Sequence, residues 1–290
     1  MLYFLALLSL STSANLAKLN QMPPEILGFW RLTIATALLV LYQLLKKNFQ
    51  TLTLNHKTKW IFISGFFFFL HLWTYKYAAK HTLVANTMVL FATNPIWASL
   101  GGLIYFHEKI GRRVYVAYFV AFLGIVYLVG SNLKFAPEYT LGNASALISA
   151  LFYAAYMLSG KKARQSFSNQ VYSTYQFMTC AVFFLLASLL SNHSFIEGYT
   201  SISWLAVMGL VILPTFLGHF ILNHLVNTIN LAVLSCGKLI EPILASIMAY
   251  FIFQESLTSS FYVPFALTSV SVMILFWPQI KNFLKRTAYP

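Results

Sequence analysis

Two charged residues stand three apart in the middle of a long apolar run, at Lys238 and Glu241. Residues three apart on a helix share one face, so the two side chains can neutralise each other. Charged groups inside a membrane are costly and are candidate functional groups by default. Such a pair can bind a zwitterion, carry a coupling proton, or hold two helices together. Pro242 follows directly and lacks a backbone N–H, so the helix can bend there.

Other apolar runs carry polar side chains at helical spacing. The residues of interest in them are His71, Tyr75, Asn94, His219 and Asn223. Polar faces of this kind must meet protein or water rather than lipid. Their convergence indicates either a shared cavity or hydrogen bonding between helices. We predict that they line a substrate site together with the lysine–glutamate pair.

The sequence offers little support for catalysis. It contains no HExxH, GxSxG or Walker motif. It also contains no Asp, which removes most Asp-based metal and phosphoryl-transfer sites. We therefore expect a protein that is not an enzyme, with no catalytic residue, no metal site and no cofactor.

The composition shows which elements must position these residues. Hydrophobic residues make up 59% of the chain and charged residues 9%, whereas a soluble domain carries about 25% charge. This excludes a soluble domain and indicates an integral membrane protein. The net charge of +13 lies in short clusters between apolar runs, as the positive-inside rule requires. The expected partners are thus the lipid bilayer and a small-molecule substrate, and not a nucleic acid.

The apolar runs predict an all-α integral membrane protein with ten transmembrane helices. Each run is close to the roughly 20 residues that a spanning helix needs, and none alternates at period two as a barrel strand does. The predicted helices are 2–18, 26–46, 60–80, 84–106, 113–130, 141–160, 171–191, 202–223, 230–253 and 259–279.

Two stretches of the chain match each other at a fixed offset. The Asn-Pro at 94–95 and the Glu-Pro at 241–242 are each followed, thirteen residues after the proline, by a glutamate, Glu108 or Glu255. The offset, 242 − 95 = 147, is close to half of 290. In an apolar chain, such duplication is typical of a transporter with its site between the halves. In the first copy, Phe91 and the asparagine replace the charged pair.

The repeat predicts the domains and their orientation. The first copy covers residues 1–134 and the second covers 135–290. Five helices per copy is an odd number, so the second copy inserts upside down and the two form inverted five-helix repeats. Cytoplasmic termini place most basic clusters inside, with Lys76 among the few lysines expected outside or at an outer helix end. We expect a multi-pass protein of the bacterial inner membrane, either a monomer or a homodimer.

Over essentially its whole length the chain resembles the EamA family of the drug/metabolite transporter superfamily. The segments that show this resemblance are FWRLTIATALLV, NPIWASLGGLIYFHEKI, GNASALISALFYAAYMLSGKKAR and EPILASIMAYFIFQESL. LGHFILNHLVNTINLAVLSCGKLIEP is similar to one subgroup, with Gly-His and Asn in helix eight and Glu-Pro in helix nine. The family's usual Trp-Gly of helix one is absent, and Lys238 is not a general family feature.

The resemblance implies export or exchange of small metabolites by rocking of two inverted halves. We therefore expect a secondary transporter for a small polar metabolite such as an amino acid, nucleoside or drug-like compound, working by alternating access. Pro95 and Pro242 are the expected helix hinges. The expected substrate-binding residues are Glu241, Lys238, His219, Asn223, His71, Tyr75 and Asn94.

Three other hypotheses stay open. Proton coupling is motivated by one buried carboxylate and two intramembrane histidines. A lipid-linked substrate flippase should show a cavity that opens sideways to lipid and is lined with basic groups. An intramembrane lipid-modifying enzyme should show Asp, His or Glu grouped at a membrane face.

Overall fold

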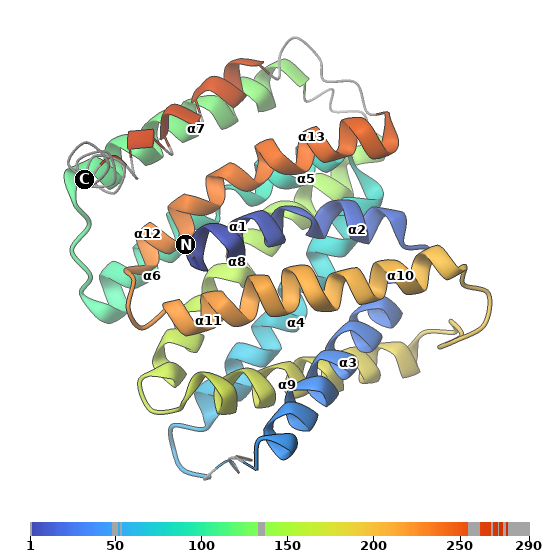
Figure 1. Cartoon of the computed structure of the whole chain (residues 1–290). Coiled ribbons are helices and arrows are strands. Elements are labelled where there is room, and N and C mark those ends of the chain that lie inside the picture. The colour runs from blue at the N-terminus through green and yellow to red at the C-terminus, as the bar shows by residue number, and fades with distance from the viewer. Residues whose placement is uncertain are drawn as a thin grey trace, which may run out of the picture.

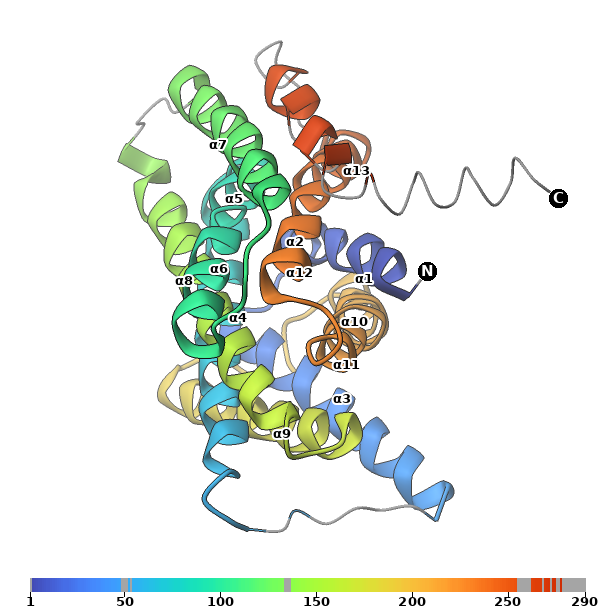
Figure 2. The ribbon, with the colours of Figure 1, turned by 90° about the vertical axis from the view of Figure 1, so that its left-hand side faces the viewer.

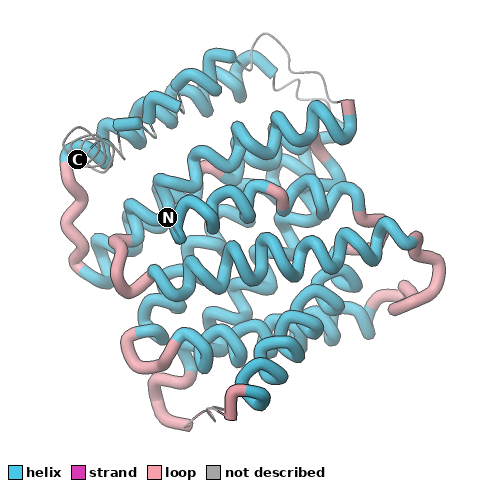
Figure 3. Tube along the Cα trace, viewed as in Figure 1, coloured by secondary structure: helices cyan, strands magenta, loops and turns pink. Residues whose placement is uncertain are grey.

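All regular elements in the described part of the chain are helices, with no strand there (Figure 3). The computed structural model describes residues 2–47, 52, 54–132, 137–254, 262–267, 269–271, 273–274 and 277. Glu255 of the second sequence motif lies outside these residues. The elements are α1 (Leu2–Ser11), α2 (Ser13–Leu19), α3 (Pro24–Leu45), α4 (Lys59–His81), α5 (Val84–Phe91), α6 (Asn94–Phe106), α7 (Arg112–Asn132), the 3₁₀-helix η1 (Pro137–Tyr139), α8 (Thr140–Arg164), α9 (Asn169–Leu190), α10 (Ser201–Leu210), the π-helix η2 (Val211–Phe220), α11 (Ile221–Leu225), α12 (Leu231–Gly237), the 3₁₀-helix η3 (Lys238–Ile240) and α13 (Glu241–Phe253).

Six helical runs in this part of the chain are long and apolar enough to cross a membrane. They are Leu2–Leu19, Pro24–Leu45, Thr140–Arg164, Asn169–Leu190, Ser201–Leu225 and Leu231–Phe253. The predicted fourth span is divided into α5 and α6, and the predicted tenth span, 259–279, is described only in part. The all-α prediction is confirmed, and the count of ten spanning helices stays a prediction.

The offset of 147 residues relates helices as well as sequence. α6 covers 94–106 and α13 covers 241–253, so both bounds are shifted by the same 147 residues. Both helices end at a residue with a left-handed backbone, His107 with φ 51° and Gln254 with φ 56°. This conformation is uncommon for residues other than glycine, and it closes helix ends by satisfying free carbonyls. The two segments therefore share one local structure down to their C-caps.

The contacts between helices also come in corresponding pairs, in which each helix of one copy is replaced by its counterpart in the other. α4 packs along α8, and η2, in the position that corresponds to α4, packs along α1. α6 packs on α8, and likewise its counterpart α13 packs on α1. The corresponding helices α3 and α9 pack on each other, and α6 packs on α12 as α13 packs on α5. Figure 1 shows α1 in front of α8, and Figure 2 shows the two on opposite sides with α6 and α12 between them.

Small residues let α8 approach α4 closely. Gly142, Ala146, Ala150 and Ala154 recur every four residues on one face of α8, and all are buried. Small side chains at such spacing allow close helix contact in membranes, where burial of apolar surface gives little driving force. The close contact brings the tyrosines of the same helix against the aromatic rings of α4, and this aromatic layer surrounds the candidate site.

Candidate functional site

The helix that carries the lysine–glutamate pair is interrupted at the pair itself. α12 ends at Gly237, the 3₁₀ turn η3 begins with Lys238, and α13 begins with Glu241. In the first copy, α5 ends at Phe91 and α6 begins at Asn94. Pro242 and Pro95 lie in the first turns of α13 and α6, where a missing N–H costs little. The predicted hinges therefore directly follow the two interruptions, and their movement stays a prediction.

Lys238 and Glu241 form a buried ion pair, with Nζ and Oε1 3.6 Å apart and side chains 3% and 4% exposed. The Lys238 ammonium also lies 3.7 Å from the centre of the Tyr153 ring and 4.9 Å from that of Phe91. Aromatic faces attract a cation in this position. Glu241 Oε1 accepts no hydrogen bond from the described residues. The lysine is thus held by rings as well as by the carboxylate, whose Oε1 is ion-paired but accepts no hydrogen bond from the described residues.

The two intramembrane histidines lie beside this pair. Their ring centres are 6.3 Å apart, and the His71 ring lies 4.9 Å from the Tyr153 ring. His71 Nδ1 is 2.8 Å from the hydroxyl of Ser149, whereas His219 Nδ1 has no hydrogen-bond partner among the described residues. Phe68 packs edge-on against His219, with 4.7 Å between ring centres. The pair, the histidines and the rings therefore form one continuous cluster.

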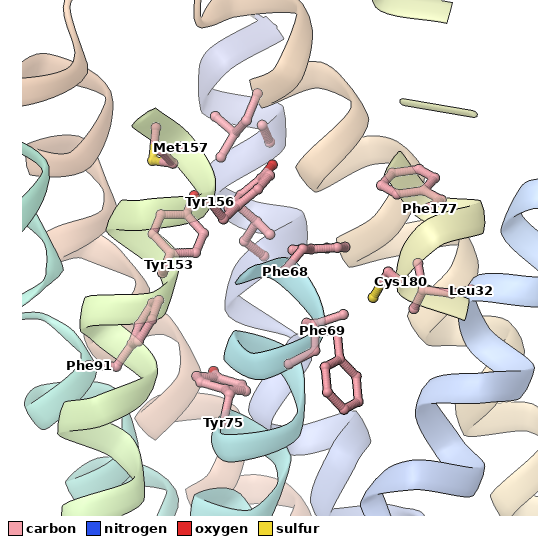
Figure 4. Packing of buried hydrophobic residues seen from close by; sticks show 14 of the residues in the cluster. Leu32, Phe68, Phe69, Tyr75, Phe91, Tyr153, Tyr156, Met157, Phe177 and Cys180 are labelled. Atoms are coloured by element: carbon pink, nitrogen blue, oxygen red, sulfur yellow. The ribbon is translucent and has the colours of Figure 1, made fainter. Parts of the chain in front are cut away.

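Tyr75 completes the cluster on the side of α4. Its ring lies 5.2 Å from that of Phe91 and 5.7 Å from that of His71. Its hydroxyl donates to the sulfur of Met88 at 2.8 Å. Figure 4 shows Tyr75, Phe91 and Tyr153 grouped on one side of Phe68.

The two predicted asparagines make their hydrogen bonds to groups other than the ion pair. Asn94 Nδ2 donates to the Phe91 carbonyl at 3.0 Å, so this residue caps the interruption in the first copy. Asn223 accepts from Tyr156 and donates to Ser173 Oγ at 3.1 Å. Asn223 therefore belongs to a network between α8, α9 and α11. Tyr156 connects that network to the central cluster, because its ring lies 6.0 Å from His219.

The π-helix η2 ends between His219 and Asn223. Thr215 Oγ1 donates to the Leu210 carbonyl five residues earlier, at 2.7 Å, and Pro214 lies within the same segment. The hydrogen bonds of a π-helix run over five residues, so its turns are wider than α-helical turns and often occur at functional sites. Residues four apart across its end need not share a face. The predicted stripe therefore crosses a change of helix type, and Tyr156 lies near both of its residues.

Three further residues of this interior were not among the predicted substrate-binding residues. Tyr153 could have been identified from the sequence. Ser149, Tyr153 and Tyr156 carry hydroxyl groups and share one face of α8 at helical spacing. Arg31 is fully buried, and its Nε donates to Thr215 Oγ1 at 2.8 Å. Lys76 lies near the C-terminal end of α4, but its side chain is buried, 1% exposed, against the ring of Phe184.

The predicted side chains fill the centre and are closed to solvent. All those predicted to bind substrate are between 1% and 4% exposed. Two larger hollows, of about 660 Å³ between α4 and α9 and about 510 Å³ between α4, α6 and α8, contain none of them. A small hollow of about 10 Å³ touches Asn223. In this conformation the polar cluster is therefore occluded.

Comparison with known proteins gives one family and a consistent fold. The model of the EamA-like transporter family matches residues 1–130 and 140–277. An uncharacterized transporter of Archaeoglobus fulgidus is 28% identical over 211 residues, covering 72% of this chain and 73% of that protein. The uncharacterized transporter in trpA 3'region of Buchnera aphidicola subsp. Schlechtendalia chinensis is 22% identical over 275 residues, covering 92% and 88%.

A solved crystal structure of another protein has the same fold. It superposes with a TM-score of 0.76 at 19% identity, covering 100% of this chain and 98% of the other. At that identity the likeness establishes the fold alone.

Proposed function

The chain belongs to the EamA-like transporter family, and from that premise we propose that it is a secondary transporter, an exporter or exchanger of a small polar metabolite. Family membership and its apolar helices make it a multi-pass membrane protein. Both curated relatives are named as transporters. The positions of the basic clusters favour a bacterial inner membrane protein with cytoplasmic termini.

The observation that carries this proposal is the buried Lys238–Glu241 pair at an interrupted helix. Interrupted helices near the interface of two repeats are where transporters bind their substrates. Glu241 keeps an oxygen without a hydrogen bond from the described residues, so a substrate amine or hydroxyl can bind there. The first copy has Phe91 and Asn94 in the corresponding places, so the site is asymmetric where the scaffold is symmetric.

Alternating access in this proposal uses the two interruptions. The spans form ten helices in two inverted five-helix repeats, 1–134 and 135–290. Bending next to Pro95 and Pro242 moves the α6 and α13 halves relative to α5 and α12. α4 packs on α8 in the first arrangement, and η2 packs on α1 in the corresponding one. This supports the scheme, because two equivalent interfaces can open in turn.

Neutralising the pair tests its role. A thermal-shift screen of the purified protein against metabolites supplies a ligand, and counterflow in proteoliposomes measures its exchange. Lys238→Met or Glu241→Gln alone leaves one buried charge unpaired, which costs about 3–5 kcal/mol. The double variant should recover most of that stability while counterflow stays lost. Intact counterflow in the double variant would show that the pair is structural.

Proton coupling is a second candidate, favoured by the two histidine rings 6.3 Å apart beside Glu241. His219 Nδ1 and Glu241 Oε1 have no hydrogen-bond partner among the described residues. Uptake into proteoliposomes should then change when a pH gradient is imposed at constant membrane potential. Uptake indifferent to the gradient removes this candidate.

A further inference from the structure

Two cations of the interior have no carboxylate partner among the described residues. The Arg31 side chain is 0% and that of Lys76 is 1% exposed. Arg31 Nε is bonded to Thr215, but Nη1 and Nη2 of Arg31 and Nζ of Lys76 make no hydrogen bond to the described residues. The ion pairs that join described residues include neither side chain.

The two cations face one place between α3, α4, α9 and η2. Arg31 and Lys76 are near enough to repel each other, and both lie near the Cys180 thiol on α9. The Lys76 ammonium lies 4.7 Å from the centre of the Phe184 ring, one turn beyond that cysteine. The same ring lies against Gly28, one turn before Arg31. Figure 4 shows Cys180 beside Leu32, which follows Arg31 in the chain.

The free protein leaves this arrangement uncompensated. A buried ion costs several kcal/mol of desolvation, and one aromatic face returns only about 0.5–2 kcal/mol. Two like charges in low dielectric also repel each other. Glu25 interacts with Lys76 at longer range, but its Oε1 is already 3.0 Å from His193 Nδ1. A negative group that enters between Arg31 and Lys76 would satisfy both.

We infer that Arg31 and Lys76 bind an anionic group of the substrate, a carboxylate or a phosphate. The two free terminal nitrogens of Arg31 form the fork that holds two oxygens of such a group. Lys76 adds a compact second charge from the neighbouring helix. This inference rests on the proposed transport function and narrows its substrates to compounds that carry an anion.

Small anions test the site without a known substrate. The melting temperature of the purified full chain is measured against sodium acetate and sodium phosphate, with sodium chloride at equal ionic strength as reference. The wild type should show a saturable rise of several degrees, because a ligand of the folded state raises its stability. Acetate alone would indicate a carboxylate, phosphate alone a phosphate, and both an unselective anion site.

Variants separate binding from a general salt effect. Lys76→Met should abolish the saturable rise, yet melt no lower than wild type without anion, because it removes an unpaired buried charge. The exposed Lys46→Met is the matched control and should keep the rise. Arg31→Lys keeps the charge but loses the planar guanidinium fork, and should weaken anion binding about tenfold or more. An equal rise in wild type and Lys76→Met, or no saturable rise with either anion, overturns the inference.

Counterflow distinguishes this inference from the transport proposal. Exchange of an uncharged or cationic compound by both wild type and Lys76→Met would retain transport and refute the anion site. Saturable anion binding that depends on Lys76, in a protein that exchanges none of its ligands, would retain the site and refute transport.

Discussion

The Lys238 ammonium lies 3.7 Å from the centre of the Tyr153 ring, so an aromatic face of α8 holds the charge that distinguishes the second copy. Phe91, which occupies the place of Lys238 in the first copy, contributes the second face at 4.9 Å. The corresponding positions of the two copies therefore meet each other at the centre of the protein. The asymmetry seen in the sequence is thus a direct contact in the structure.

Tyr153→Leu should weaken the hold on Lys238 by about 0.5–2 kcal/mol, because it removes a cation–π face. Tyr153→Phe should be close to neutral, since the ring remains and the hydroxyl makes no hydrogen bond to the described residues. Thermal unfolding in detergent measures both. In a Lys238→Met background the loss of stability caused by Tyr153→Leu should be smaller. An unchanged loss would show that Tyr153 stabilises by packing alone.

Thr215→Val should destabilise the protein by about 1–3 kcal/mol, because it leaves the Arg31 guanidinium without its acceptor. The two side chains have nearly the same shape, so packing changes little. Thr215→Ser keeps the hydroxyl and is the matched control, with unfolding in denaturant as the measurement. Equal stability of the Val and Ser variants would contradict a role for the 2.8 Å hydrogen bond.

Glu108 should contribute more than its ion pair. It is paired with Lys161, and its Oε2 accepts from the Leu231 N–H at 3.1 Å, so it joins the end of α6 to α8 and α12. Glu108→Ala should cost about 1–3 kcal/mol and more than Lys161→Met. The charge swap Glu108→Lys with Lys161→Glu should fail to restore stability, because a lysine cannot accept from Leu231. Restoration by the swap would show that the ion pair alone matters.

Gly65→Ala should destabilise the contact of α4 with α9 by about 1–3 kcal/mol, as overpacking does. An added Cβ would lie 2.6 Å from Thr179 Cβ and 2.9 Å from the Gln176 carbonyl oxygen. The carbonyl belongs to the helix backbone, which cannot easily shift to relieve the overlap. Gly111 has nothing within 4 Å of an added Cβ, so Gly111→Ala is the control and should be nearly neutral. The two melting temperatures decide this, and equal values would mean that α4 and α9 can separate freely.

Much of the interior follows from local chemistry. The three-residue spacing of Lys238 and Glu241 correctly predicted that they pair, and Pro95 and Pro242 correctly indicated where the long helices are interrupted. Local rules suffice there because residues three apart on a helical segment face the same way, and proline disturbs the helix that carries it. The sequence did not indicate the π-helix, so the change of helix type between His219 and Asn223 was not predictable from α-helical spacing.

By itself, the sequence determined the helical class, the family, the duplicated segments and the charged pair, because each depends on composition or on neighbours within one helix. Only the tertiary structure decided that Tyr153 faces Lys238, that Arg31 reaches Thr215, and that Lys76 is buried. Periodicity tells which residues share a helix face, but not which faces of other helices they meet. Burial and charge balance depend on those contacts between helices. Arg31 and Lys76 could therefore be recognised as cations without a carboxylate among the described residues only in the packed molecule.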